Sequence, residues 1–158
     1  MELQALHSVA PHGALAKFAV LGSGPLPLTS LCIFDGLQYQ KYGPACIHNV
    51  DHDPLAIAQS SKLCHALGHT EKTICFRCAD AQADTVELCH FDVVYLAALA
   101  GICCEQKHDI ITSVVKRMRP GALLVLRTAH SLRGLLYPVG PWKMTSSLVR
   151  IPAKSQYR

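Results

Sequence analysis

Short apolar runs rich in β-branched and aromatic residues alternate along this chain with longer segments of helical pattern. This alternation limits the fold more than any other feature, because strands that are separated by helices pack as a parallel sheet. The pattern predicts an α/β fold: a doubly wound, mostly parallel, Rossmann-like sheet with helical crossovers on both faces, in three αβα layers. The predicted strands cover 17–22, 45–51, 73–80, 91–99 and 122–130, with at most one more at 146–151, and the predicted helices cover 27–40, 53–68 and 107–121.

Two of these segments carry clear local signals. In the helix predicted over 53–68, Asp53 is the N-cap, Pro54 takes the first position and Gly68 ends the helix. The segment 91–99 is apolar on both faces, as expected of a central parallel strand. Ligands of such sheets bind beyond the carboxyl ends of the strands, so the residues that follow strands are the candidates for a binding site.

Composition indicates a globular protein of one domain. The chain has 158 residues, of which 50% are hydrophobic and 16% are charged, enough for one core of ordinary size. The net charge of +4 is spread without a basic run, so we expect no nucleic-acid partner. The longest apolar segment, 93–104, is about eight residues short of a bilayer span, and the first residues lack signal-peptide features. We therefore expect no membrane partner and a cytoplasmic location.

The stretch "FAVLGSGPLPLTS" places two glycines and two prolines directly after the first predicted strand. Gly22, Ser23 and Gly24 would let a ligand approach the backbone, with free N–H groups at a helix start; the alternative is a plain turn. Pro25 and Pro27 stiffen the loop where helix donors are unpaired anyway. Pro27 takes the third glycine position of the dinucleotide motif, which disfavours a pyrophosphate and leaves NAD as the second choice.

Single acidic residues follow the second and third predicted strands. Asp51 stands where doubly wound nucleotide folds place a carboxylate for ribose hydroxyls, whereas Asp53 is better explained as a helix cap. Asp80 would accept a hydrogen bond from an adenine amino group, with Ala81 and Gln82 beside the base. The alternative for Asp51 and Asp80 is a solvated loop acid. With the glycine loop, these residues predict an adenosine pocket that fits S-adenosylmethionine better than NAD.

Cysteine and histidine spacing raises a second hypothesis, a zinc site. "CFRC" has C-x-x-C spacing, and further ligand pairs are Cys64-His65, Cys89-His90 and Cys103-Cys104. However, Cys75 and Cys78 lie in a predicted strand, where a spacing of three turns their side chains to opposite faces. We therefore expect reduced thiols and no metal requirement.

Four stretches resemble the nicotianamine synthase family in order and at comparable spacing: "VLGSGPLPLTS", "FDVVYLAALAG", "RPGALLVLRTAH" and "LRGLLYPV". The resemblance runs from about residue 16 to about residue 140, and the proline-bearing glycine loop is its most specific motif. It implies a class I S-adenosylmethionine-dependent methyltransferase-like domain preceded by a helical domain. It also implies transfer of 3-amino-3-carboxypropyl groups from S-adenosylmethionine, so that three molecules condense into the metal chelator nicotianamine and methylthioadenosine is released.

By position, the resemblance implies which residues contact this donor. The donor would lie against Gly22, Ser23, Gly24, Pro25 and Leu26, with its ribose at Asp51, its adenine at Asp80 and Ala81, and its sulfonium region at Leu96, Ala97 and Ala98. No residue is assigned to acid–base catalysis, and the candidates are Arg127, His130 and Tyr137. The alternatives for these three are a surface ion pair, a hydrogen-bonded loop histidine and a core aromatic residue.

The departures from the family lie at both ends of the chain. Residues 1–16 would be the remnant of the helical domain, with Leu3, Leu6 and Ala10 at the end of its last helix. Residues 141–158 would be an incomplete C-terminal strand region. We therefore expect a truncated homologue with one S-adenosylmethionine-binding domain over 1–158.

Whether this short form is active stays open at this point. The alternatives are a non-catalytic S-adenosylmethionine-binding remnant and a small-molecule methyltransferase. Small-molecule substrates are the expected partners in each case, and a homo-oligomer is left open.

Overall fold

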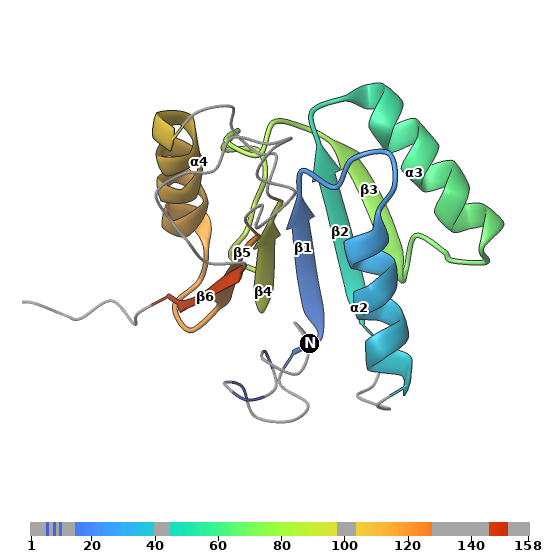
Figure 1. Ribbon diagram of the computed structural model, residues 1–158, viewed down its shortest axis with the longest axis horizontal. Helices are drawn as coiled ribbons and strands as arrows, with labels where there is room; N and C mark the ends of the chain where they lie inside the picture. The colour runs from blue at the N-terminus through green and yellow to red at the C-terminus, as the bar shows by residue number, and fades with distance from the viewer. Residues whose placement is uncertain are drawn as a thin grey trace, which may run out of the picture.

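The computed structural model describes residues 6, 8, 10, 15–39, 45–97, 104–127 and 146–151. A central sheet carries helices on both of its faces (Figure 1). Each predicted element is present, with ends that shift by at most four residues. The strands are β1 (Lys17–Leu21), β2 (Cys46–Asp51), β3 (Ile74–Cys78), β4 (Val93–Leu96), β5 (Leu123–Arg127) and β6 (Ser146–Arg150), and the helices are α2 (Leu28–Tyr39), α3 (Pro54–Ala66) and α4 (Cys104–Arg117).

The sheet has the strand order β3-β2-β1-β4-β5-β6. β1 pairs in parallel with both β2 and β4, and β3 and β5 extend the parallel sheet on either side. β6 is antiparallel to β5. The predicted doubly wound, mostly parallel sheet is therefore confirmed, and its switch point lies between the carboxyl ends of β1 and β4.

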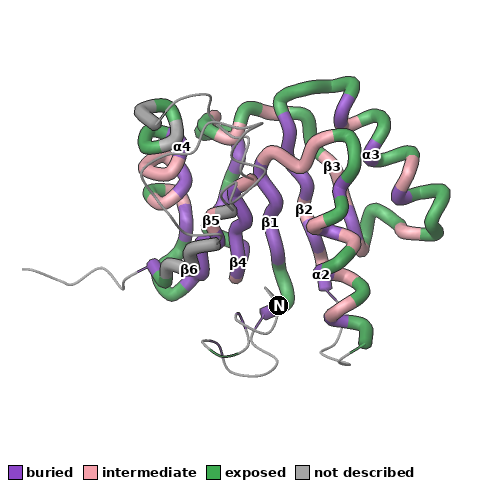
Figure 2. Tube along the Cα trace, viewed as in Figure 1, coloured by how far each residue is buried: buried purple, intermediate pink, exposed green. Residues whose placement is uncertain are grey.

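Alternate residues of β1 belong to two separate cores, as the period of a strand requires. Phe18 and Val20 pack in the core beneath α2 and α3, whereas Ala19 and Leu21 pack in the core beneath α4. β1 and β4 are the most continuously buried part of the sheet (Figure 2). The prediction of a central strand that is buried on both faces is confirmed for β4, which lies between β1 and β5.

A buried polar pair fixes α2 against the sheet. Ser30 of α2 and Asn49 of β2 are fully buried, and the Ser30 hydroxyl donates to Asn49 Oδ1. The Asn49 amide in turn donates to the Cys75 carbonyl of β3 at 3.4 Å. Because buried polar groups are costly unless they are paired, this chain of bonds favours one position of α2 over β2.

The helix caps predicted for α3 are confirmed. Asp53 Oδ1 accepts a hydrogen bond from the Leu55 N–H at 2.8 Å, and Pro54 is the first helical residue. Gly68 follows the last turn with φ of 85°, and the backbone bonds of a Schellman turn satisfy the carbonyls of the last turn.

The connection between β3 and β4 differs from the prediction of helical crossovers. Residues 79–92 contain no helix; they form a series of turns that we call the crossover loop. Val86, Leu88 and Phe91 of this loop are buried and pack in the core beneath α4. The side chains of these three loop residues therefore cover this part of the sheet, where we expected an amphipathic helix.

Arg117, in the last turn of α4, donates hydrogen bonds to backbone carbonyls of the crossover loop. In a helix, backbone N–H groups would have satisfied such carbonyls. Its Nη1 donates to the carbonyls of Ala83 and Val86, both at 2.8 Å, and its Nη2 donates to the Ala81 carbonyl. Burial lowers the pKa of Arg117, and the negative charges of Asp84 and Asp80 oppose that shift. Carbonyls far from the arginine in sequence are thus satisfied by a planar, charged donor.

The first described residues extend the core beneath α2 and α3. Leu6 and Ala10 are buried there, and the Ala10 N–H donates to the Leu6 carbonyl at 3.0 Å, which is one helical turn. Two of the apolar positions singled out at this end of the chain, Leu6 and Ala10, are therefore core residues; the third, Leu3, lies outside the described residues.

Candidate functional site

The candidate site lies at the carboxyl ends of β1, β2, β3 and β4. These ends share one edge of the sheet (Figure 1), and backbone hydrogen bonds join the loop after β3 to the end of β2 and the loop after β4 to the end of β1. The Ala79 N–H donates to the Asp51 carbonyl at 2.9 Å, and the Ala97 N–H donates to the Leu21 carbonyl at 3.0 Å. Residues that are distant in sequence therefore meet around the loop that follows β1.

The loop after β1 is held open by its two glycines. Gly22 and Gly24 have φ of 75° and 67°, the left-handed region that costs other residues energy. The N–H groups of Gly22 and Ser23 both point at the Val50 carbonyl, at 2.8 and 3.3 Å. Among the described residues, and apart from the two chain neighbours of Gly24, no atom lies within 4 Å of the place where a Cβ of Gly24 would be. The loop thus presents open space beside its backbone.

Ser23 contributes a hydroxyl that the fold leaves unused. Its Oγ is shielded from solvent and has no hydrogen-bond partner within the described part of the chain. Buried hydroxyls nearly always have a partner. A polar atom of a ligand would supply one.

Asp51 is the centre of the site. It is 8% exposed, its Oδ2 accepts from the Gly24 N–H at 2.8 Å, and its Oδ1 accepts from the Asp53 N–H at 3.0 Å. Each carboxylate oxygen can accept a second hydrogen bond. Asp51 therefore lies where the sequence predicted it, and it also fastens the glycine loop to the end of β2, a role that the sequence did not predict.

The loop after β3 places Asp80 and Ala81 at the same edge of the sheet. Asp80 is exposed, and its Oδ1 accepts from the Gln82 N–H at 2.8 Å, which makes an Asx turn. Arg117 holds the Ala81 carbonyl. This loop is therefore fixed from two directions, with one oxygen of the Asp80 carboxylate unused by the turn.

The two prolines of the glycine loop differ in their exposure to solvent. Pro25 and Leu26 are exposed, and Pro27 is buried. The Pro27 carbonyl accepts from the Leu31 N–H at 3.1 Å, so Pro27 is the N-cap residue of α2, where a missing N–H has no cost. The predicted stiffening of the helix start has a structural basis at Pro27.

The remaining predicted site residues are only partly described. Leu96 is buried at the end of β4 and Ala97 follows it beside Leu21. Arg127 is the last residue of β5, and only its backbone is described. Ala98, His130 and Tyr137 lie outside the described residues.

The described part of the chain does not bring Cys75 and Cys78 together as the alternative hypothesis of a C-x-x-C zinc site would require. The free thiols there are Cys32, Cys46, Cys64, Cys75, Cys78 and Cys89. Cys78 donates to the His52 carbonyl at 3.6 Å, whereas Cys75 interacts with Cys46, across the other face of the sheet. The predicted separation of Cys75 from Cys78 is therefore confirmed.

Burial sets the protonation of the groups around Cys46. Its Sγ lies 3.1 Å from His48 Nε2. Burial, followed by the positive charge of Lys17, lowers the pKa of His48, and burial together with the neighbouring Cys46 raises the pKa of Cys75 to about 11. At neutral pH these groups are therefore a neutral imidazole and a protonated thiol.

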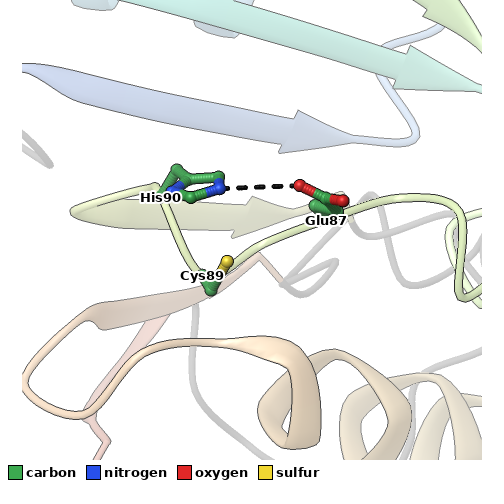
Figure 3. Close-up of side chains that lie close together, drawn as sticks. All are labelled: Glu87, Cys89 and His90. Atoms are coloured by element: carbon green, nitrogen blue, oxygen red, sulfur yellow. Dashed lines mark ion pairs between the residues drawn. The ribbon is translucent and has the colours of Figure 1, made fainter.

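A different set of metal-ligating side chains lies together in the crossover loop. Glu87, Cys89 and His90 each offer a ligand atom, and these three atoms lie within 4.8 Å of one another. All three residues are exposed, and Figure 3 shows their side chains on neighbouring positions of the loop. The sequence had offered Cys89 and His90 as one ligand pair among several, without Glu87.

The helices of the described segments give no membrane span, since none of them combines the necessary length with sufficient hydropathy.

Comparison with known proteins gives sequence relatives and structural neighbours. Residues 1–146 match the family model described as nicotianamine synthase protein. The chain is 42% identical over 129 residues to nicotianamine synthase 9 of Hordeum vulgare, and this alignment covers 82% of this chain and 37% of that protein. It is 42% identical over 123 residues to nicotianamine synthase of Solanum lycopersicum, and that alignment covers 78% of this chain and 38% of the Solanum lycopersicum protein. The chain thus spans little more than a third of the length of these relatives.

Solved structures share the fold at low sequence identity. The YcgJ protein of Bacillus subtilis superimposes with a TM-score of 0.60 at 15% identity, covering 82% of this chain and 50% of that chain. The S-adenosylmethionine-dependent methyltransferase SibL superimposes with a TM-score of 0.58 at 16% identity, covering 82% and 38%. The predicted methyltransferase-like architecture is therefore confirmed.

Proposed function

This chain belongs to the nicotianamine synthase family, and from that membership we propose that its glycine loop and the loops after β2, β3 and β4 bind S-adenosylmethionine. The bond between Asp51 and Gly24 carries this proposal. It holds a half-buried loop with open space beside its backbone next to a carboxylate that has acceptor capacity left. An adenosine ribose needs such an acceptor for its two hydroxyls.

The bound donor would lie across the switch point of the sheet. Its ribose would donate to Asp51, and its adenine amino group would donate to the exposed carboxylate of Asp80. The amino-acid part would pass the backbone of Gly24, where the hydroxyl of Ser23 is within the same loop. Leu96 and Ala97 would form the apolar surface beneath the sulfonium, which is the least polar side of the site.

The reaction that we propose is 3-amino-3-carboxypropyl transfer to an amine. The amine nitrogen attacks the Cγ of the methionine part, a C–N bond forms, and the C–S bond breaks with its electron pair on sulfur. Methylthioadenosine leaves, and the new ammonium loses a proton to a base. The orientation of the donor selects this carbon among the three that the sulfonium activates, so the loops that fix the donor also select the product.

We assign the base to none of the residues whose side chains are described. The candidates stay Arg127, the last residue of β5, and His130 and Tyr137, which come later in the sequence; Arg127 would bind a carboxylate bidentately. Histidine is the one of the three whose ordinary pKa suits proton transfer near neutral pH. We propose small molecules as the substrates, one donor-binding domain over 1–158, and neither a nucleic-acid nor a membrane partner.

A second function that we propose as the alternative is donor binding without transfer. It is favoured by the described residues, because they include the loops assigned to the donor, whereas no described side chain is assigned to the base. The binding site would still be intact, because all of the loops that form it are within the chain.

Calorimetry and mass spectrometry distinguish these functions. The purified chain is titrated with S-adenosylmethionine and with methylthioadenosine, and the mixture is analysed for products. Nicotianamine with methylthioadenosine supports the transferase, and binding without a new product supports the binding module. S-adenosylhomocysteine would identify a methyltransferase instead, and failure to bind either compound would disprove the site.

A further inference from the structure

The crossover loop presents a second group of reactive side chains, apart from the donor site. Its residues alternate between core and solvent: Val86 and Leu88 are 3% and 1% exposed, and Phe91 is 9% exposed. The residues between them, Glu87, Cys89 and His90, are therefore turned outward, and His90 and Glu87 have side chains that are 67% and 73% exposed.

The backbone that carries these side chains is fixed at both ends. Arg117 donates to the Val86 carbonyl at 2.8 Å on one side. Arg119 donates to the Phe91 carbonyl at 3.3 Å on the other side and pairs with Asp92. The three outward side chains are thus mounted on a short segment whose neighbours cannot move without breaking charged hydrogen bonds.

The three ligand atoms are already close together. His90 Nε2 lies 3.5 Å from Glu87 Oε2, and the ring and the carboxylate face one another across the turn that carries Cys89 (Figure 3). The thiol, imidazole and carboxylate atoms all lie within 4.8 Å of one another. Bonds of about 2.0–2.3 Å to one zinc ion bring tetrahedral ligands to roughly 3.3–3.8 Å from each other. Rotation about side-chain bonds is enough to close the difference.

We propose that Glu87, Cys89 and His90 bind a zinc ion, with water in the fourth position. Sulfur and imidazole ligands favour zinc over magnesium and calcium, which prefer oxygen. The carboxylate and the thiolate together neutralise the charge of the ion. Zinc displaces the thiol proton on binding, so the site needs no thiolate beforehand.

The position of this site sets it apart from the donor site. Asp92 Oδ2 accepts hydrogen bonds from the N–H groups of Ala16 and Lys17, both at 2.8 Å, at the start of β1. His90, two residues before Asp92, is therefore near the amino ends of β1 and β4, whereas the donor site is at their carboxyl ends. The metal would fasten a loop that has no helical hydrogen bonds of its own.

Cobalt substitution tests the site directly. Co²⁺ is titrated into the reduced, metal-free chain, and a sulfur-to-cobalt charge-transfer band in the near ultraviolet reports coordination by a thiolate. We expect this band to saturate at one equivalent, Zn²⁺ to abolish it by displacement, and Zn²⁺ to raise the Tm. Cys89→Ser should lose the band and the rise in Tm, and His90→Gln should weaken Zn²⁺ binding at least tenfold.

Cys32→Ser is the matched control, because Cys32 is an exposed thiol on α2, outside the group. It should keep the band, and circular dichroism should show that each variant is folded. A band that survives in Cys89→Ser, a band that is lost in Cys75→Ser, or the absence of any band in the wild type would each disprove the site. S-adenosylmethionine binding by Cys89→Ser should be unchanged, so failure of the zinc site is distinguishable from failure of the donor site.

Discussion

The carboxylate of Asp51 lies 2.8 Å from the backbone nitrogen of Gly24, a residue 27 positions earlier in the chain. This bond connects the end of β2 to the loop after β1. The stability of the fold and the proposed binding of S-adenosylmethionine therefore depend on the same side chain, and substitutions of Asp51 should affect both.

Asp51→Asn should weaken S-adenosylmethionine binding at least about tenfold and lower the free energy of unfolding by about 1–3 kcal/mol. The asparagine side chain has one acceptor oxygen where Asp51 has two, so it can accept from the N–H of Gly24 or of Asp53 but not from both in the same way. Its NH₂ group would then face the N–H group that has lost its acceptor. Calorimetry and denaturant unfolding measure the two effects. Asp53→Asn is the matched control: asparagine caps a helix as well as aspartate does, so binding should be unchanged. If Asp51→Asn and Asp53→Asn bound S-adenosylmethionine with equal affinity, Asp51 would not be a ligand-binding residue.

Gly24→Ala should destabilise the protein by about 1–2 kcal/mol, the cost of a side chain in the left-handed region. Open space surrounds the added Cβ, so no clash contributes. Gly68→Ala is the matched control. Gly68 also has a positive φ, 85°, and open space where its Cβ would be, but it lies just after the end of α3, away from the candidate site. Both variants should lose similar stability by denaturant unfolding, and only Gly24→Ala should bind S-adenosylmethionine more weakly. Unchanged binding by Gly24→Ala would mean that the donor does not occupy this space.

Arg117→Met should lower the free energy of unfolding by about 2–4 kcal/mol, because the carbonyls of Ala81, Ala83 and Val86 lose a charged donor. Hydrogen exchange across residues 79–92 should rise in the same variant. Lys116→Met, at the exposed neighbouring position, should change stability by no more than about 0.5 kcal/mol. Equal effects of the two substitutions would contradict the role of the guanidinium.

His48 should make stability depend on pH. Burial lowers the pKa of His48 in the folded protein, so the unfolded chain binds a proton more readily as the pH falls. The free energy of unfolding should therefore decrease as the pH drops below about 6.5, the ordinary pKa of histidine. His48→Gln should show a smaller decrease in denaturant unfolding at a series of pH values, and the exposed control His65→Gln should match the wild type. If the free energy of unfolding of His48→Gln fell with pH as steeply as that of the wild type, the pH dependence would come from groups other than His48.

Local signals in the sequence were sufficient for most of the fold. The limits and caps of α3 follow from Asp53, Pro54 and Gly68, which act within a few residues of one another. The burial of β4 follows from a run of apolar residues, and the parallel order follows from the alternation of strands and helices. The positions of Asp51 and Asp80 at the sheet edge follow in turn, because both residues end or follow strands.

Contacts between distant residues account for what the sequence did not predict. The crossover loop has no helix, and Arg117 satisfies carbonyls in it that lie 31 to 36 positions before the arginine; no local period in the sequence reveals such bonds. The same holds for the Ser30–Asn49 pair, and for the bond of Asp51 to Gly24. The grouping of Glu87 with Cys89 and His90 depends on which neighbours are buried, a consequence of the same loop.

The bonds of Arg117 also set the order in which the chain can assemble. While the protein is being synthesised, β1, β2 and β3 are complete before the arginine that satisfies the carbonyls of the next loop has been added. These first strands must therefore wait, with one face of the sheet uncovered, until α4 is made. Until then the uncovered face exposes apolar side chains, and such surface makes a partly folded chain prone to aggregation.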